Sequence, residues 1–279
     1  MTAGTSLLPP DTAVGRVALR VDDLDRLVDF YTSVVGLAVL ARTDDQATLG
    51  AGGRPLLELV RGPDAHPRSR EEAGLFHTAF RVPDRAALGA ALSRVETSWQ
   101  LTGASDHRVS EALYLWDPED NGIEIYRDFP REEWPTADGR VGMDTLPLER
   151  DALRAESSGD DALPDGADVG HVHLEVTDLD AARAFYEDTL GLGVRAEWTG
   201  AAFLAAGDYH HHVGLNVWSG RTAPAAGRGL DWFELVVPAD ALAAVRDRVA
   251  EAGIAVTETA EGILVRDPDR LAVRISVGE

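Results

Sequence analysis

The feature that most constrains the fold of this chain is an internal repeat. Residues 17–37 (VALRVDDLDRLVDFYTSVVGL) align without a gap on residues 172–192 (VHLEVTDLDAARAFYEDTLGL), at an offset of 155 residues. A second pair of segments, 75–92 and 230–247, has the same offset. Self-similarity at a fixed offset indicates duplicated structural units. The chain is therefore a tandem duplication.

Each half of the chain is itself double. Arg16 and His77 are 61 residues apart, as are His171 and Trp232, and the fifth residue after each of the four is valine. Each position opens a strand pattern that is followed by a helix pattern and by further strands between turn signals. We therefore expect an α+β fold of four βαβββ modules in tandem, arranged as two domains that form cupped mixed sheets.

The repeat also sets the expected domain boundaries. The two double halves cover residues 12–129 and 168–279, which leaves a segment rich in Pro, Asp, Glu and Ser between them. This segment, residues 130–167, has little periodicity, so we expect it to be a linker that crosses the surface.

Composition excludes several classes of function. The net charge is −22 and all 26 basic residues are arginine, a balance that disfavours nucleic acid and anionic membranes as partners. We interpret the acidity as a salt-adapted, halophilic-type surface. No apolar run is long enough to span a membrane, so we expect a cytoplasmic protein. The absence of cysteine leaves His, Asp, Glu and amide or backbone oxygens as metal ligands.

Equivalent positions of the four modules should point into equivalent places, because strand residues alternate between two faces. The first strands carry Arg16, His77, His171 and Trp232, and the last strands carry Glu58, Glu124, Asn216 and Arg274. Only the second and third modules offer metal ligands at both ends of a site. We therefore expect the two inner modules to pair around His77, His171 and Glu124, while the outer modules form a structural pair. Two histidines and one carboxylate leave coordination positions open and suit non-haem Fe(II).

Other histidines lie near this predicted centre. His173 shares a face with His171, but only His171 aligns with His77, so we expect His173 to pack or to support a ligand. In the stretch GDYHHHVGLN, alternation places His210 and His212 on the cavity face with Asn216. His212 is a candidate acid or base, and a surface histidine cluster is the alternative. A hairpin through 117–122 would also bring the phenol of Tyr114 near the metal.

These segments resemble the vicinal oxygen chelate superfamily, and within it the extradiol ring-cleaving dioxygenases of the catechol 2,3-dioxygenase kind. The stretches GHVHLEVTDLDAARAFYEDTLGLG, LFHTAFRVPD, SDHRVSEALYLWDPEDNGIEIYRD and AGDYHHHVGLNVW carry the resemblance. The FY…LG helix marks only the superfamily, which includes glyoxalases and bleomycin-binding proteins. The DHRVS…Y…E and HHH stretches are the more specific ones.

The resemblance implies residue roles and a reaction. His77, His171 and Glu124 look like the iron ligands, His212 like the acid/base histidine and Tyr114 like a tyrosine that hydrogen-bonds a substrate oxygen; His107 lies in the matching segment. The implied reaction is Fe(II)-dependent cleavage of a catechol-like ring by O2, with Mn(II) as a possible replacement metal. The implied partners are a small aromatic substrate and O2, with a homo-oligomer possible.

One departure and two alternatives accompany this resemblance. In many two-domain extradiol enzymes the C-terminal half supplies both histidines and the glutamate, whereas here Trp232 and Arg274 occupy two of those positions. Pairing of modules across the halves would account for the difference. The alternatives are a glyoxalase-like or isomerase enzyme that uses Ni, Zn or Mn, with Asn216 as a fourth ligand, and a module that only binds a small aromatic.

Overall fold

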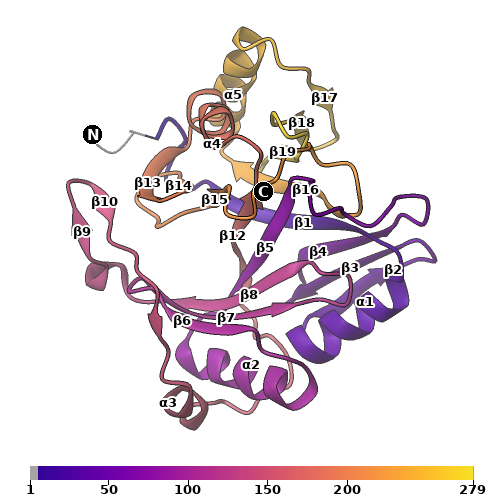
Figure 1. Cartoon of the computed structure of the whole chain (residues 1–279), viewed down its shortest axis with the longest axis vertical. Coiled ribbons are helices and arrows are strands. Elements are labelled where there is room, and N and C mark those ends of the chain that lie inside the picture. Colours follow the sequence, from indigo (N-terminus) through magenta and orange to yellow (C-terminus); the bar gives the residue numbers. More distant parts are fainter. Residues whose placement is uncertain (1–5, 279) are drawn as a thin grey trace.

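The computed structural model describes residues 6–278 and contains two large mixed sheets (Figure 1). The outer sheet has the strand order β17 (Thr257–Glu258), β18 (Gly262–Arg266), β19 (Ala272–Val277), β16 (Gly229–Val237), β1 (Ala13–Val21), β4 (Arg54–Arg61), β3 (Gln46–Ala51) and β2 (Ala38–Arg42). The inner sheet has the order β11 (Leu146–Pro147), β6 (Gly103–Asp106), β7 (Ser110–Trp116), β8 (Gly122–Asp128), β5 (Gly74–Arg81), β12 (Asp168–Glu175), β15 (Val213–Asn216), β14 (Ala201–Ala205) and β13 (Gly193–Trp198).

The order of elements confirms four βαβββ modules and their pairing across the two halves. The second and third modules build the inner sheet, and the first and fourth build the outer sheet. In each sheet the first strands of the two modules meet antiparallel at the centre, β5 against β12 and β1 against β16. Within every module the first strand is parallel to the last strand. The first and last strands of one module therefore lie side by side, which brings their side chains to one place.

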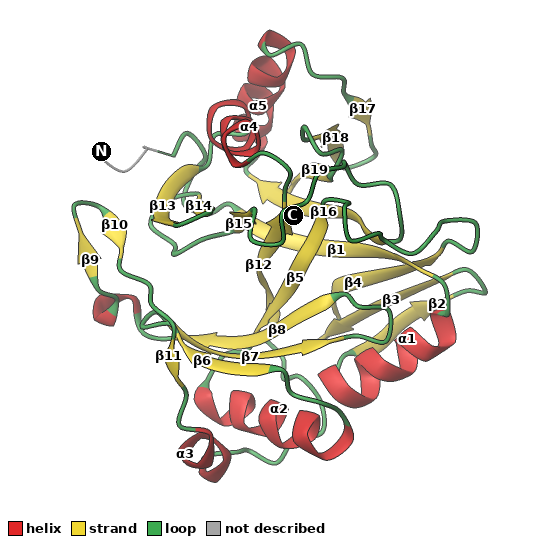
Figure 2. Cartoon of the chain, in the orientation of Figure 1, coloured by secondary structure: helices red, strands yellow, loops and turns green. Residues whose placement is uncertain are grey.

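The helices gather at two opposite ends of the molecule (Figure 2), and their buried apolar residues belong to the main hydrophobic core. They are α1 (Leu24–Phe30) with a π-helical turn (Tyr31–Val35), α2 (Arg85–Ser98), α3 (Arg150–Ala155), α4 (Leu179–Ala184) with a π-helical turn (Phe185–Thr189), and α5 (Ala239–Glu251), besides a 3₁₀ turn (Arg131–Glu133). Asp23, Asp84 and Asp178 cap three of these helices, because each carboxylate accepts a hydrogen bond from a backbone N–H of the first turn.

The repeated tyrosine of the FY…LG segments joins each odd module to the next. Tyr31 donates a hydrogen bond to Asp117 at 3.0 Å, and Tyr186 donates one to Asp267 at 3.2 Å. Both acceptors sit in the turn before the last strand of the following module, and all four residues are buried. The FY…LG helix is therefore scaffold that ties the outer sheet to the inner one.

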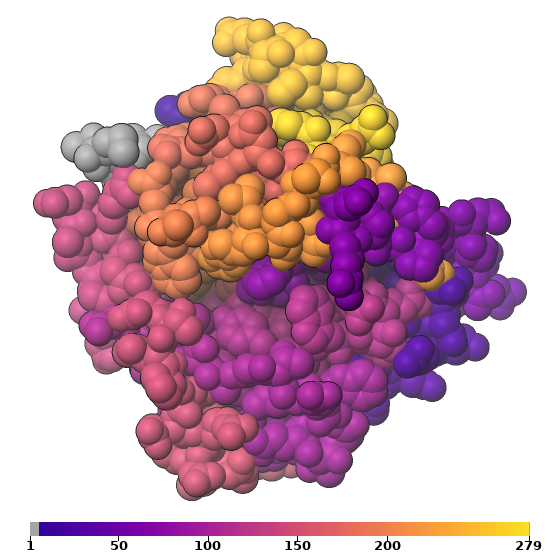
Figure 3. Space-filling view, viewed as in Figure 1, coloured from indigo at the N-terminus to yellow at the C-terminus, as the bar shows by residue number. Residues whose placement is uncertain are grey.

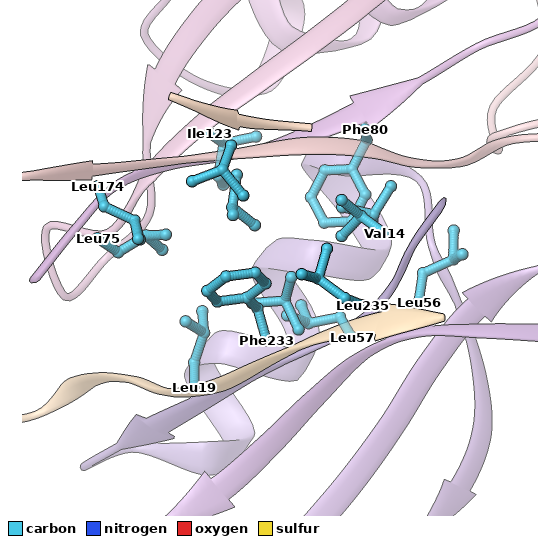
Figure 4. Packing of buried hydrophobic residues seen from close by; sticks show 14 of the residues in the cluster. Val14, Leu19, Leu56, Leu57, Leu75, Phe80, Ile123, Leu174, Phe233 and Leu235 are labelled. Carbon is cyan, nitrogen blue, oxygen red and sulfur yellow. The ribbon is translucent and has the colours of Figure 1, made fainter. Parts of the chain in front are cut away.

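The main hydrophobic core fills the space between the two sheets (Figure 4). Leu19, Leu57 and Phe233 of the outer sheet face Leu75 and other apolar residues of the inner sheet, and each of these side chains is at most 2% exposed. Because the two sheet faces that meet in this core are apolar, the polar and charged strand residues lie on the opposite face of each sheet. Those opposite faces are where a site can form.

A β-bulge precedes the repeat-equivalent position in all four modules. The pairing of β5 with β12 gains an extra residue at Phe76 on one strand and at Gly170 on the other. The pairing of β1 with β16 is irregular at the corresponding places, directly before Arg16 and at Asp231. A bulge re-aims the side chain that follows it. Phe76 and His77 consequently both line one cavity, although regular alternation would separate them.

The segment between the two halves has structure of its own. It contains a short hairpin, β9 (Thr136–Ala137) with β10 (Arg140–Val141), and β11, which extends the inner sheet beside β6. Helix α3 also lies in it, and Trp134 and Val141 are buried beside Tyr209. This segment therefore adds a strand to the inner sheet and buried side chains beside it. Among the described helices, none has the length and apolar character needed to cross a membrane.

Candidate metal centre and active site

Three neighbouring strands of the inner sheet bring two histidines and one glutamate together. Nε2 of His77 on β5 and Nε2 of His171 on β12 lie 3.0 Å and 3.1 Å from Oε2 of Glu124 on β8. The candidate ligand atoms all lie within 4.8 Å of one another, and the three side chains are buried. Within residues 6–278 this is the one cluster of three or more His, Asp or Glu side chains with such geometry.

The protonation states of this cluster suit a cation. Burial alone would raise the pKa of Glu124, but the imidazoles of His171 and His77 outweigh it and hold this pKa well below the usual range. Burial lowers the pKa of His171 to about 4, although Glu124 opposes that shift. A carboxylate and a neutral imidazole are the forms that bind metal ions.

An unsatisfied atom also fits a metal ion. His77 Nε2 is buried and makes no hydrogen bond with any described residue, even though it faces the Glu124 carboxylate. A buried polar nitrogen without a partner is costly, and a metal ion held between the three side chains would satisfy it. Two imidazoles and one carboxylate fill one face of a metal's coordination sphere and leave positions open for other ligands. The inner sheet therefore presents the donor set of a metal site of the type found in non-haem iron enzymes.

The three side chains lie at the base of a cavity of about 260 Å³. Its walls are mostly aromatic and apolar, and they come from both inner modules and from the segment between the halves: Phe76, Val109, Met143, Trp198, Phe203 and Trp218. In Figure 3 the orange surface of the third module lies against the magenta surface of the second. No arginine lines this cavity among the residues that the structure describes. An uncharged planar ring fits such walls.

Tyr114 and His107 reach the cavity as a hydrogen-bonded pair. Tyr114 is the cross-strand partner of Glu124 on β7 and β8. His107 Nδ1 donates to the backbone oxygen of Asp144 at 2.7 Å, so a neutral His107 accepts at Nε2 from the Tyr114 hydroxyl, also at 2.7 Å. Burial raises the pKa of Tyr114 well above its usual value, and Glu124 adds to the shift. Both residues lie where the sequence places them.

The histidine run departs from the prediction. Strand β15 begins only at Val213, so the alternation assumed for the preceding histidines does not apply. His211 lines the main cavity, with its ring centroid 4.1 Å from that of His171. His212 instead accepts a hydrogen bond from the Ala206 amide and lines a separate cavity beside Arg81 and Tyr209. The position expected for His212 is therefore taken by His211.

His210 lies behind His211 and outside the main cavity. Its Nδ1 is 2.7 Å from Nδ1 of His211, and its Nε2 is 2.9 Å from Oδ1 of Asp128. The expectation that His210 faces the cavity is thus wrong for the same reason as for His212. Nothing in strand alternation could have found this contact, because the residues lie in a loop.

The equivalence of Asn216 with Glu124 is also wrong by two residues. In the inner sheet Ala79 pairs with Glu124 and, at the equivalent place in the third module, His173 pairs with Gly214. A Cβ on Gly214 would lie 2.8 Å from the His173 ring, so the missing side chain leaves room for that ring. Asn216 does not line the cavity; its side-chain oxygen accepts from the Trp218 amide.

His173 itself packs in the aromatic wall. Its ring lies 5.1 Å from the rings of Phe76 and His77 and 5.4 Å from that of Trp218, measured between centroids. Its Nε2 is buried without a hydrogen-bond partner. His173 is therefore a wall residue of the cavity that packs against His77.

The outer sheet has a different set of side chains at the same positions. Arg16 forms ion pairs with Glu58 and Glu234, both at 3.1 Å, and the guanidinium of Arg274 lies 3.6 Å from the ring centroid of Trp232. In this sheet the guanidinium of Arg16, a cation that belongs to the chain, lies between two carboxylates. The first and fourth modules thus pair as the sequence predicts, and among the described residues they hold no cluster of metal ligands.

Comparisons with known proteins agree with this architecture. A family model described as the Glyoxalase/Bleomycin resistance protein/Dioxygenase superfamily matches residues 13–125 and 168–275. A Bacillus subtilis (strain 168) protein named catechol-2,3-dioxygenase is 43% identical over 270 residues, which cover 92% of this chain and 94% of that protein.

Solved structures share the fold at low sequence identity. A Bacillus subtilis protein described as a candidate dioxygenase superposes with a TM-score of 0.64 at 16% identity, covering 99% of this chain and 86% of the other. Glyoxalase I from Zea mays superposes with a TM-score of 0.61 at 18% identity, covering 96% and 92%. On the strength of the matched family model, the chain belongs to the glyoxalase/bleomycin resistance protein/dioxygenase superfamily.

Proposed function

We propose that this protein is a non-haem Fe(II)-dependent extradiol dioxygenase that cleaves a catechol-like aromatic ring with O2. The observation that carries the proposal is the open His77, Glu124 and His171 cluster at the base of an aromatic-walled cavity. The relative named catechol-2,3-dioxygenase, at 43% identity, supports the same activity. His77, His171 and Glu124 are the proposed metal ligands.

His77, His171 and Glu124 would hold Fe(II), which would supply the electron transfer between the aromatic substrate and O2. The protein's own residues have three tasks. The apolar walls orient the ring and exclude water. The Tyr114 hydroxyl, which donates to His107, keeps its oxygen lone pairs free to accept a hydrogen bond from a substrate hydroxyl. His211, in contact with the His171 ring, is the proposed acid or base in place of His212.

The cavity also favours an uncharged substrate. Its described lining residues include one carboxylate, that of Glu124, and no arginine or lysine. A carboxylate on the substrate ring would be buried there without a cationic partner. Burying an unpaired neutral polar group costs roughly 2 to 7 kcal/mol, and an unpaired charge costs more. We therefore expect catechol and apolar-substituted catechols to be used in preference to carboxylated ones.

Anaerobic loading with Fe(II), followed by catechol and air, tests the activity. We expect oxygen uptake together with a yellow ring-opened product, and a higher kcat/KM for 4-methylcatechol than for 3,4-dihydroxybenzoate. Loading with Mn(II) under the same conditions tests the alternative metal. Turnover without oxygen uptake would favour the isomerase alternative, and binding of catechol equally well after metal removal, without turnover, would favour a non-catalytic binding module.

Three further expectations stay predictions. They are the cytoplasmic location, the homo-oligomeric state and the salt-adapted function of the acidic surface. Fractionation, light scattering and activity as a function of salt concentration are the respective measurements.

A further inference from the structure

The side of His211 that faces away from the cavity is joined to a chain of hydrogen bonds that the proposed reaction has not used. Asp128 Oδ1 lies 2.9 Å from His210 Nε2, and His210 Nδ1 lies 2.7 Å from His211 Nδ1. His210 is 1% exposed and His211 is 7% exposed. The chain therefore runs from a carboxylate, through one buried imidazole, to the imidazole that lines the cavity.

The other oxygen of Asp128 is occupied by two donors. Oδ2 accepts from Arg81 Nη1 and from the Tyr209 hydroxyl, each at 3.0 Å. Asp128 thus receives donors on both oxygens and acts only as an acceptor. Its partner His210 must then carry a proton on Nε2.

The proton on His210 determines the proton on His211. In a neutral imidazole only one nitrogen carries a proton, so Nδ1 of His210 is an acceptor once Nε2 donates to Asp128. The 2.7 Å contact between the two Nδ1 atoms requires one donor, which must be His211. His211 Nε2 then has no proton, and among residues 6–278 it makes no hydrogen bond with the protein.

We infer that Asp128 and His210 are positioning residues that hold His211 in the tautomer protonated at Nδ1, so that a basic Nε2 is left for the substrate. The inference rests on the proposed function only for its kinetic consequence; the tautomer is a property of the chain itself. Neither Asp128 nor His210 has to contact the substrate. Their effect reaches it through the ring of His211.

The substitution Asp128→Asn tests the inference, because its outcome is fixed by the surroundings. The amide oxygen has to stay with the two donors, Arg81 and Tyr209, which turns the NH₂ group toward His210 Nε2. His210 would then accept at Nε2 and donate from Nδ1, and His211 would move its proton to Nε2. A carboxylate-to-amide change that imposes the wrong histidine tautomer is expected to lower kcat by roughly 10² to 10⁴-fold.

The matched control is Asp168→Asn. Asp168 forms a 2.6 Å ion pair with the same Arg81 but does not contact His210. This variant disturbs the arginine and leaves the histidine chain intact. It should keep the wild-type tautomer and most of the wild-type kcat.

The readout is the nitrogen spectrum of the full-length, metal-free protein labelled with ¹⁵N-histidine. Long-range ¹H–¹⁵N correlations separate protonated from unprotonated ring nitrogens, and loss of one set of signals in His211→Gln assigns His211. We expect protonation at Nδ1 in the wild type and in Asp168→Asn, and at Nε2 in Asp128→Asn. His210→Phe, which removes the acceptor of His211 Nδ1, should give a mixture of tautomers.

Two results would overturn the inference: His211 protonated at Nε2 in the wild type, or a His211 tautomer that is the same in Asp128→Asn as in the wild type. The first would mean that His210 carries two protons and donates to His211. If the spectra agree with the inference but the wild type shows no oxygen uptake with catechol, the proposed function fails and the tautomer assignment stands. Normal turnover by Asp128→Asn with His211 protonated at Nε2 would leave the proposed function standing and would overturn the positioning function of Asp128 and His210.

Discussion

The inner and outer sheets share one strand arrangement but carry different charged side chains at equivalent positions. In both, two βαβββ modules meet through their first strands, and a bulge precedes the position that starts the site. The inner sheet places His77, His171 and Glu124 there, which leaves a place for an ion from solution. The outer sheet places Arg16 between Glu58 and Glu234, so that the cation belongs to the chain. The shared backbone sets the geometry, and a few side chains decide between catalysis and structural support.

The largest expected effect separates two glutamates at equivalent positions. Glu124→Gln removes a proposed metal ligand and should lower kcat/KM by at least about 10³-fold, comparable to the loss of a main transition-state contact. Glu58→Gln alters the same position of the outer sheet and should leave kcat/KM nearly unchanged. Steady-state oxygen uptake with catechol measures both. Similar losses in the two variants would mean that the sheets are not divided in function.

Stability should show the opposite pattern. Arg16→Met leaves Glu234, whose side chain is 6% exposed, without its guanidinium partner. Removing one partner of a buried ion pair is strongly destabilising, and we expect about 2 to 4 kcal/mol because Arg16 is itself partly exposed. Urea unfolding measures this loss, and the fraction that stays folded should keep wild-type activity.

Arg42→Ala is the control for that variant. It removes an ion pair with Asp25 that is mostly exposed, so less than about 1 kcal/mol should be lost. Equal destabilisation by both substitutions would contradict a structural function of the outer-sheet cation.

Metal loading should stabilise the protein through the inner sheet alone. A metal at 100 times its dissociation constant stabilises the folded state by about 2.7 kcal/mol, which raises Tm by several degrees. We expect this rise in the wild type and in Arg16→Met but not in His77→Gln, as measured by calorimetry with and without a chelator. An undiminished rise in His77→Gln would place the metal elsewhere.

The last expected effect depends on pH. It concerns the turn before the last strand of a module, which occurs in an equivalent place in both sheets. Burial raises the pKa of Asp267 to about 7. Because this pKa is higher in the folded than in the unfolded state, the stabilisation from the protonated acid is complete below about pH 4 and is lost as pH rises to about 7. Asp267→Asn has no such proton to lose. Relative to the wild type, its free energy of unfolding should therefore rise between pH 5 and pH 8 by about 2 to 3 kcal/mol, which a rise in relative Tm would report.

The inner sheet offers the matching test at Asp117, in the equivalent turn. Burial also raises the pKa of Asp117. The difference in Tm between Asp117→Asn and the wild type should change with pH in the same direction. A difference that does not vary with pH in either variant would show that these carboxyl groups titrate normally.

The sequence repeat predicted much of this architecture because duplicated modules repeat their hydrophobic pattern and turns. It identified the four modules, their pairing across the halves and the cluster of His77, His171 and Glu124. The resemblance and the expected hairpin likewise brought Tyr114 and His107 to the cavity. These predictions depend on position along strands, which the sequence determines well.

The errors have a common physical cause. Strand alternation does not extend to His210 and His212, which precede the strand, and a match between last-strand patterns equates Asn216 with Glu124 where the register places Gly214. Bulges and loops change which side a residue faces, and neither changes the hydrophobic pattern. The chain from Asp128 to His211 joins residues 83 positions apart through a loop, so no local signal could reveal it.

The most direct test of the division between the two sheets is a crystal structure of the Fe(II)-loaded protein with anomalous data at the iron edge. We predict one iron peak per chain, within coordination distance of Nε2 of His77, Nε2 of His171 and a carboxylate oxygen of Glu124, and no peak beside Arg16. A peak beside Arg16, or an iron that contacts only one of the two histidines, would contradict the account.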